Sequence, residues 1–486
     1  MQHWRGLVLP FAWILVAAFC SQALALSAQE LPPLRWGADA EGGAPYIFQS
    51  PDDPGQNIGL EVDLAAALAK EIGRAIEFRQ YNYDSLLSGL ARGDIDLAMN
   101  GIEATPDRRR EFRLSRPYYT YRIQLVARAD ETRFDSLQTC KAAGGVVGTL
   151  GDTVSSRVLE EQGIRSKVYD GQAEPYQDLA LGRIDAVLLD EPIALYYAAP
   201  NERLKFVGEP FREGHYVIAF RKDQEELASQ VDAALDRLDK SGELARIKAK
   251  WEKPQGNVLA QTASRQTFDR YFPVLCRAAW VTIKVSVLSM ALAMAIGLVV
   301  AMCRLYGPVP VRWTAIAYVE FFRGIPVLLL LYLLYYGIPT ILAQADLGFQ
   351  FKPSDFTVAI LAFGLNYAAY EAEIYRAGIS AIPAGQWEAA TSLGMSWPLT
   401  FRRIILPQAL RTIIPPVTND FVALFKDTSL VSVIAVVELT KQYQILAKSS
   451  LKYLEIGAAT AALYLIMSVP LGFLARHLEK RWGKGQ

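Results

Sequence analysis

The residue types that bind metals and phosphates are sparse in this sequence. Histidine occurs only at His3, His215 and His477, and the four cysteines show no close pairing. Such separations are not typical of the clustered ligands of zinc sites or of a disulfide framework. The pattern GxxxxGK[ST] of a phosphate-binding loop is also missing, because Lys484 in GKGQ lacks the required spacing. The sequence predicts no metal site, no cofactor bound by this chain and no ATP hydrolysis of its own.

Charged residues inside an apolar stretch suggest a different chemistry. Asp420, Lys426 and Asp427 interrupt the largely apolar residues 412–440, which also include Glu438 near their end. Charge within a bilayer is costly, so such side chains line a polar pathway or pair with one another. A translocation role and a structural pairing of Lys426 with either aspartate both remain open.

The chain divides into two halves of opposite charge. Its 486 residues include 50 basic and 50 acidic side chains, and this balance argues against a general nucleic-acid binder. Residues 1–260 hold 38 acidic and 30 basic side chains, a formal charge of −8, whereas residues 261–486 hold 12 and 20, a formal charge of +8. The hydrophobic content of 52% excludes a disordered chain. We therefore expect two chemically different domains.

The N-terminus predicts an export signal. Arg5 precedes 24 uncharged residues, 6–29, with small residues near Ala25 and Ala28. We predict a signal peptide over residues 1–28, and an uncleaved anchor is the alternative. Either would place the following segment outside the cytoplasm.

Residues 29–252 alternate short apolar strands with amphipathic helices. Apolar residues recur at helical spacing over 60–72, and a further helix is predicted over 84–91. Residues 146–148 and 186–189 have the composition of buried strands. This alternation predicts an α/β domain with a largely parallel sheet.

Beyond a polar linker at residues 253–266, the composition becomes typical of membrane helices. A bilayer crossing needs about 20 apolar residues. Three uncharged stretches are long enough, a fourth is short, and the stretch that contains Asp420, Lys426 and Asp427 is counted as a fifth. In that order they are 285–303, 324–345, 456–475, 356–370 and 412–440. We predict an all-α, five-helix transmembrane domain over residues 267–486.

The charges of the connecting segments predict its orientation. With the first domain outside, five crossings place residues 304–314, residues 376–411 and the tail from Arg476 onward in the cytoplasm. These segments hold ten lysines and arginines, against four in the opposite loops. The excess agrees with the positive-inside rule and explains the charge of the second half.

The first domain resembles the periplasmic solute-binding proteins for polar amino acids over essentially its whole length. The matching segments occur in the same order as in that family: LRWGADA, IGLEVDLAAALAKEIG, YNYDSLLSGLARGDIDLAMNGIEATPDRRREFRLSRPYY, VVGTLGDT and GRIDAVLLDEP. The resemblance implies a two-lobed α/β fold of type II, with a cleft for an amino acid between the lobes.

The resemblance also implies roles for the residues that would hold a zwitterion. Arg108 in TPDRRR matches the arginine that clamps the ligand carboxylate. Thr153 matches a position whose hydroxyl and N–H reach that carboxylate, a role compatible with capping a helix. Asp190 matches the aspartate that binds the ammonium group, with capping of the next turn as the alternative.

The resemblance implies further pocket positions that contact the substrate side chain. Tyr46 and Tyr83 fall at aromatic positions of the family pocket, although Tyr46 is equally explained as core. Asp39 matches an aspartate that reads polar side chains, and Gly101 belongs to the same pocket.

Two departures from the family pattern leave the substrate open. EGGA at residues 41–44 replaces an expected aromatic residue and includes an extra residue. Glu103 stands where a small hydroxyl residue is expected. It either selects a cationic side chain, such as that of arginine or lysine, or has a structural role.

The second domain resembles the permeases of ABC importers for polar amino acids. The segment EAATSLGMSWPLTFRRIILP reproduces their EAA pattern, whose residues are Glu388, Ala389, Ala390, Gly394, Leu406 and Pro407. The resemblance implies that this loop docks on a separate ATPase subunit, with Glu388 anchoring it by charge and Gly394 allowing a bend. An amphipathic cytoplasmic helix without a partner is the alternative.

These features predict a subunit of an ABC importer in the bacterial inner membrane, with its binding domain on the periplasmic side. It would capture a polar amino acid and form the pathway for uptake driven by ATP on a partner subunit. The permease domain would most simply pair with a copy of itself. A ligand-gated channel or sensor is the alternative, but it leaves the EAA pattern unexplained. A dehydratase with Glu103 as acid or base is opposed by the membrane domain.

Overall fold

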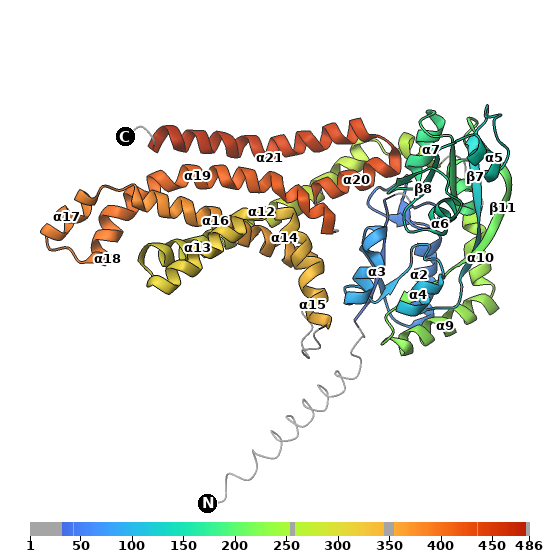
Figure 1. Ribbon diagram of the computed structural model, residues 1–486, viewed down its shortest axis with the longest axis horizontal. Helices are drawn as coiled ribbons and strands as arrows, with labels where there is room; N and C mark the ends of the chain where they lie inside the picture. The colour runs from blue at the N-terminus through green and yellow to red at the C-terminus, as the bar shows by residue number, and fades with distance from the viewer. Residues whose placement is uncertain (1–31, 42, 253–257, 345–353, 435, 483–486) are drawn as a thin grey trace, which may run out of the picture.

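An α/β domain lies at one end of the molecule, and a bundle of long helices extends away from it (Figure 1). This computed structural model describes residues 32–482 except 42, 253–257, 345–353 and 435. The predicted signal peptide, residues 1–28, lies outside the described residues. The fold class is as predicted, an α/β domain followed by a helical domain.

The α/β domain has two lobes, each built on a five-stranded sheet. The first sheet has the strand order β4-β1-β5-β12-β6. Its strands are β1 (Leu34–Ala38), β4 (Ile76–Gln80), β5 (Leu97–Ala98), β6 (Arg113–Leu114) and β12 (Ala219–Phe220). The helices of this lobe are α2 (Leu60–Ile72), α3 (Tyr83–Arg92), α4 (Pro106–Glu111), α9 (Glu225–Lys240) and α10 (Glu243–Glu252), and β2 (Phe48–Gln49) pairs with β3 (Asn57–Ile58).

The second sheet has the strand order β11-β7-β10-β8-β9. Its strands are β7 (Tyr119–Arg128), β8 (Val147–Leu150), β9 (Ser166–Tyr169), β10 (Ala186–Asp190) and β11 (Leu204–Tyr216). Its helices are α5 (Leu137–Ala142), α6 (Val154–Glu161), α7 (Ala173–Ala180) and α8 (Glu191–Tyr197). The chain passes between the lobes twice, after β6 and after β11, so the sequence of the second lobe is inserted into the first.

The prediction of a largely parallel sheet is wrong. β1 runs parallel to β4 and β5, and β8 runs parallel to β9 and β10. The remaining strand pairs are antiparallel, namely β7 with β10 and β11, and β12 with β5 and β6. The strands before and after each crossing, β6 with β7 and β11 with β12, are antiparallel to their neighbours in the sheets. The reason is that the chain enters and leaves the second lobe from the same side.

Helix α2 shows how the local sequence forms these elements. Leu60, Leu64 and Leu68 recur every fourth residue, so they share one face of the helix, and all three are buried. Each such burial contributes about 1.5–3 kcal/mol. The helix ends at Gly73, whose φ of 70° is favourable for glycine.

The helical domain begins within the region predicted as a linker. Residues 258–265 of that linker form α11 (Val258–Arg265). The long helices are α12 (Phe268–Tyr306), α13 (Val309–Gly324), α16 (Asp355–Ser380), α19 (Leu406–Asp427) and α21 (Tyr453–Trp482). The shorter ones are α14 (Val327–Tyr332), α15 (Ile338–Gln344), α17 (Ala384–Ser392), α18 (Trp397–Thr400) and α20 (Leu439–Ser450). Single-turn segments with other helical hydrogen bonding occur at Leu333–Gly337, Phe401–Ile405 and Thr428–Ile434.

Membrane-spanning character is strongest in α12 and α21. Within the described residues, these two helices are long and apolar enough to cross a bilayer, and a third span arises if α13 and residues 327–342 count as one bent span. The predicted span over 324–345 corresponds to continuous helix from Val327 to Gln344, and the axis turns by 102° at its start, between Gly324 and Val327. Pro326 lacks an N–H and disfavours helical geometry at Ile325, so α13 ends and a new helix starts at Val327.

Small residues bring α12 and α16 close together. A Cβ added at Gly297 of α12 would lie 2.7 Å from the Cβ of Glu371 and 3.0 Å from the carbonyl oxygen of Ala368. On α16, a Cβ at Gly364 would lie 2.6 Å from Leu292. Such close backbone approach is typical of helix pairs in membranes. Helices α17 and α18 lie at the end of the bundle that is far from the α/β domain, as the predicted orientation requires (Figure 1).

Candidate functional site

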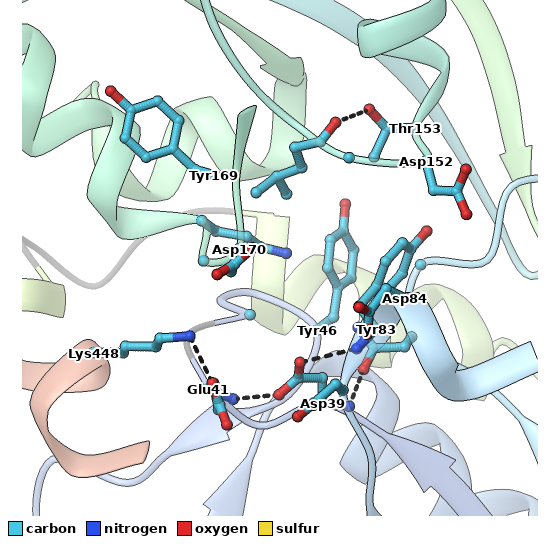
Figure 2. Close-up of a pocket in the computed structure, with 18 of the residues that line it drawn as sticks. Asp39, Glu41, Tyr46, Tyr83, Asp84, Asp152, Thr153, Tyr169, Asp170 and Lys448 are labelled. Carbon is cyan, nitrogen blue, oxygen red and sulfur yellow. Dashed lines mark hydrogen bonds and ion pairs between the residues drawn. The ribbon is translucent and has the colours of Figure 1, made fainter. Parts of the chain in front are cut away.

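A cavity of about 640 Å³ lies between the two lobes and is completed by the helical domain. Seven of the eight predicted pocket residues line it: Asp39, Tyr46, Tyr83, Gly101, Glu103, Thr153 and Asp190. The helical domain contributes Ser432, Val433, Lys441, Gln444 and Lys448. Figure 2 shows side chains from the two lobes facing one another across the cavity, with Lys448 at its edge.

Arg108, the eighth residue, is buried beside the cavity rather than lining it. The hydroxyl of Thr105 caps α4 by accepting the backbone N–H of Arg108 at 3.3 Å. The guanidinium donates to the carbonyl oxygens of Glu103 at 3.2 Å and Asp152 at 3.1 Å. Arg108 therefore bridges the two lobes. Arg109 and Arg110 are exposed, as expected for surface arginines.

Glu103 occupies the place implied for the ligand carboxylate. Its side chain is 2% exposed, and its carboxylate accepts the Val154 N–H at 2.9 and 3.0 Å and the Tyr121 hydroxyl at 3.0 Å. Val154 is the first residue of α6, and a helix N-terminus favours an anion. One carboxylate oxygen also lies 3.6 Å from Nη1 of Arg108. In this conformation Glu103 has the structural role.

Burial works against the charge on Glu103. It raises the pKa of this carboxyl, although the Val154 amide and the Arg108 guanidinium both favour the charged form. Any ligand carboxylate that binds Arg108 and α6 must displace a carboxylate that is already paired there. The site is thus occupied by the protein itself.

Thr153 forms the N-cap of α6. Its hydroxyl accepts the Ser156 N–H at 3.2 Å and donates to the carbonyl oxygen of Leu150 at 2.9 Å. The Ser156 hydroxyl in turn accepts the Thr153 N–H at 3.2 Å, which completes a reciprocal capping box. The capping role is therefore realised at the wall of the cavity.

Asp190 ends β10 in a buried position. Its carboxyl accepts a hydrogen bond from Tyr216, whose hydroxyl oxygen accepts one from Tyr46 at 2.9 Å. The side chain makes no capping bond to α8, so the alternative of a turn cap is wrong. Burial, followed by repulsion from Glu103, raises the pKa of Asp190 well above its ordinary value. Tyr46 is fully buried and also lines the cavity, so it belongs both to the core and to the pocket wall.

Asp39 is held rigidly at the other end of the cavity. Its Oδ2 accepts the backbone N–H of Tyr83 at 3.1 Å, and its Oδ1 accepts Gln80 Nε2 at 2.9 Å and the Glu41 N–H at 3.0 Å. Figure 2 shows the contacts to Tyr83 and Glu41. Burial and then the Glu41 carboxylate raise the pKa of Asp39 to about 6. Gly101, with φ of 62°, donates its N–H to the buried Glu61 at 2.6 Å and shapes the cavity floor through its backbone.

Sequence reasoning missed Glu41 and its partners on α20. Glu41 accepts a hydrogen bond from Lys448 at 2.7 Å and forms an ion pair with Lys441. Burial opposes the charge on Glu41, but the two lysines outweigh it and lower the pKa of its carboxyl. The unmatched EGGA segment was the one available signal, and nothing in it indicated a partner 400 residues away.

The EAA segment forms a helical hairpin at the far end of the bundle. Trp397 of α18 stacks on Trp387 of α17 and on Phe401, with ring centroids 6.1 and 5.4 Å apart. Gly394 follows α17 with φ of 74°, where a side chain would be strained. Glu388, Ala389 and Pro407 are exposed, Leu406 is half-buried, Ala390 is buried, and Leu393 is 79% exposed.

The charges of the 412–440 stretch separate in space. Asp420 and Asp427 line a second cavity of about 470 Å³ together with Arg323. Asp427 accepts a hydrogen bond from Tyr367 at 2.7 Å. Lys426 is exposed, and in the described part of the chain no ion pair joins it to either aspartate. Of the two alternatives, the structural pairing is wrong, because Lys426 pairs with neither aspartate in the described residues and does not line the cavity that both share.

Two family models match this chain in succession. Residues 34–254 match the bacterial extracellular solute-binding proteins, family 3, and residues 293–484 match the binding-protein-dependent transport system inner membrane component. Both matches agree with the two domains of the structure.

Individual proteins are also similar to one or the other half of this chain. A probable amino-acid ABC transporter permease of Bacillus subtilis (strain 168) is 37% identical over 43% of this chain and 90% of that protein. The glutamine transport system permease of Escherichia coli (strain K12) is 37% identical over 43% of this chain and 93% of its own length. An ancestral arginine-binding protein bound to arginine is 32% identical over 46% of this chain and 99% of that chain, with a TM-score of 0.43. The chain belongs to the family of inner membrane components of binding-protein-dependent transport systems, and it carries a family 3 solute-binding domain fused to that component.

Proposed function

We propose that this chain is the combined receptor and permease of an ABC importer for polar amino acids. The observation that carries the proposal is a solute-binding cavity closed by the permease domain of the same chain, with Lys441 and Lys448 among its lining residues. A receptor that delivers its ligand to a permease must place its cleft against that permease. Covalent fusion raises the effective concentration of the receptor there to about the millimolar range of short tethers.

The charges of the cavity fit a zwitterionic substrate. At one end Arg108 and the N-terminus of α6 offer a positive site for an α-carboxylate. Asp190 lies on the second lobe as the partner for an α-ammonium group, and Asp39 would bind polar atoms of the substrate side chain. Entry of the substrate requires the Glu103 carboxylate to leave Val154 and Arg108.

Transport requires an ATPase partner, as for other members of the permease family. We infer that Glu388 and Leu393 contact this partner. Both are exposed, and they belong to the hairpin of α17 and α18, which lies at the end of the bundle opposite the receptor (Figure 1). We also propose that two copies of the permease domain pair in the assembled transporter. Co-purification of the ATPase, with and without Glu388→Arg, tests the first contact.

A binding screen tests the substrate class. The full chain in lipid nanodiscs is titrated with each of the twenty amino acids by calorimetry. We expect one or a few polar amino acids to bind, and Arg108→Ala to weaken their binding by at least the ~1.5–3 kcal/mol of a charge-assisted hydrogen bond. Arg109→Ala, which removes an exposed arginine from the same helix, is the matched control. Absence of binding to all twenty, or unchanged affinity in Arg108→Ala, contradicts the proposal.

A further inference from the structure

Lys441 is a buried cation that the helical domain places inside the receptor cavity. Only 2% of its side chain is exposed. Its ammonium group donates to Asn82 Oδ1 at 2.5 Å and pairs with Glu41. Asn82 immediately precedes α3 in the first lobe, so a side chain of α20 reaches two separate segments of the receptor.

Lys441 and Lys448 approach the same carboxylate from one helix. They are seven residues apart, about two helical turns, and therefore share a face of α20. Lys448 Nζ lies 2.7 Å from Glu41 Oε2 (Figure 2). We call Asp39, Glu41, Lys441 and Lys448 the acidic-end cluster.

The two acids of this cluster need cations. The backbone N–H of Glu41 donates to Asp39 at 3.0 Å, and both side chains line the same end of the cavity. A buried charge is strongly unfavourable unless it is paired. When the helical domain is in place, its two lysines supply the compensating charge. If the receptor separated from the helical domain, Asp39 and Glu41 would face the cavity without these two lysines and would attract another cation.

Other contacts hold α20 and its neighbours against both lobes. The hydroxyls of Tyr81 and Tyr335 are 2.9 Å apart, and Arg92 lies over the Tyr335 ring at 4.9 Å. On the second lobe, Tyr453 donates a hydrogen bond to Glu174 at 3.0 Å. Lys441 therefore enters the cavity as part of a broad contact between the domains.

We propose that Lys441 is a specificity and release residue whose ammonium group, paired with Glu41, takes the place of a substrate's cationic side chain at this end of the cavity. A receptor in contact with the permease then binds an amino acid with a cationic side chain more weakly than the separated receptor does. This inference rests on the proposed amino-acid function. Under this proposal, the Lys441 ammonium group and the cationic side chain of the substrate compete for one acidic site, and this competition releases the substrate to the permease.

Binding of L-arginine and L-glutamine to the full chain tests this competition. In nanodiscs, we expect Lys441→Met to raise the affinity for L-arginine by about tenfold, the effect of one pK unit of charge interaction, and that for L-glutamine by less than threefold. Lys452→Met, which removes a lysine that pairs only with Glu455 and a backbone carbonyl in the described residues, should change neither. Unchanged, weaker or absent L-arginine binding in Lys441→Met overturns the proposal.

Hydrogen exchange on the same samples tests the contact without any ligand. We expect Glu41→Gln to speed amide exchange in residues 439–450, whereas Glu77→Gln, at an exposed site of β4, should not. Unchanged exchange in Glu41→Gln overturns the assigned pairing. If the wild-type chain binds L-glutamine or another polar amino acid, the proposed function stands even when the Lys441→Met result contradicts the role of Lys441. The two failures are therefore distinguishable.

Discussion

Glu103 is expected to compete with the substrate, and its removal should strengthen substrate binding. The carboxylate accepts the Val154 N–H and the Tyr121 hydroxyl and lies 3.6 Å from Arg108. A substrate carboxylate must replace these contacts before it gains its own. Glu103→Thr removes the competing charge and restores the small hydroxyl residue that the family pattern leads us to expect.

The magnitude follows from the contacts that the substrate would inherit. A hydrogen bond to a charged group contributes about 1.5–3 kcal/mol, so release of a single such contact raises affinity roughly 10- to 150-fold. The ligand-free variant should be less stable, because the partly buried Val154 N–H loses its partner at a cost of up to about 1–3 kcal/mol. Ligand should then restore more stability in the variant than in the wild type.

Calorimetry and thermal unfolding of the full chain in nanodiscs check both effects. The substrate affinity should rise, the ligand-free Tm should fall, and the ligand-induced increase in Tm should grow in Glu103→Thr. Glu111→Thr changes an exposed glutamate at the end of α4, the helix that follows Glu103, and serves as the control. A loss of affinity of tenfold or more would refute the reasoning, since it would make Glu103 a contact of the substrate itself.

Three further predictions concern pH, packing and assembly. Burial raises the pKa of the Asp39 carboxyl to about 6. The contribution of this carboxyl to folding stability is therefore fully present below its ordinary pKa near 4 and is lost as the pH rises through 6. The dependence of Tm on pH over this window should be flatter in Asp39→Asn. Gly297→Ala should destabilise the chain by about 1–3 kcal/mol in thermal unfolding, because its Cβ meets α16 backbone, while Gly324→Ala meets nothing within 4 Å and should not; equal Tm values would contradict the packing. Glu388→Arg should reduce ATPase co-purification at least severalfold with the substrate affinity unchanged, and full retention of the ATPase would exclude this contact.

The positions of the pocket residues were largely predictable because the motifs that carry the family resemblance place them, as for Asp39 and Tyr83. Local structure supports two of these positions. A side chain that follows a buried strand or begins a helix lies at the edge of its sheet, and Thr153 and Asp190 both meet this condition. Proline alone did not predict the break before Pro326, because Pro273 and Pro470 lie inside the continuous helices α12 and α21.

The sequence by itself determined the order of the two domains, their chemical contrast and most of the cavity lining. These properties depend on composition and on spacing over a few residues. Only the tertiary structure decided which charges meet. Glu103 faces Val154 across the cleft, and Glu41 meets Lys448 although 407 positions separate them in the chain. The reason is physical: an ion pair depends on distance in space, and folding joins residues whose separation along the chain carries no record of that contact.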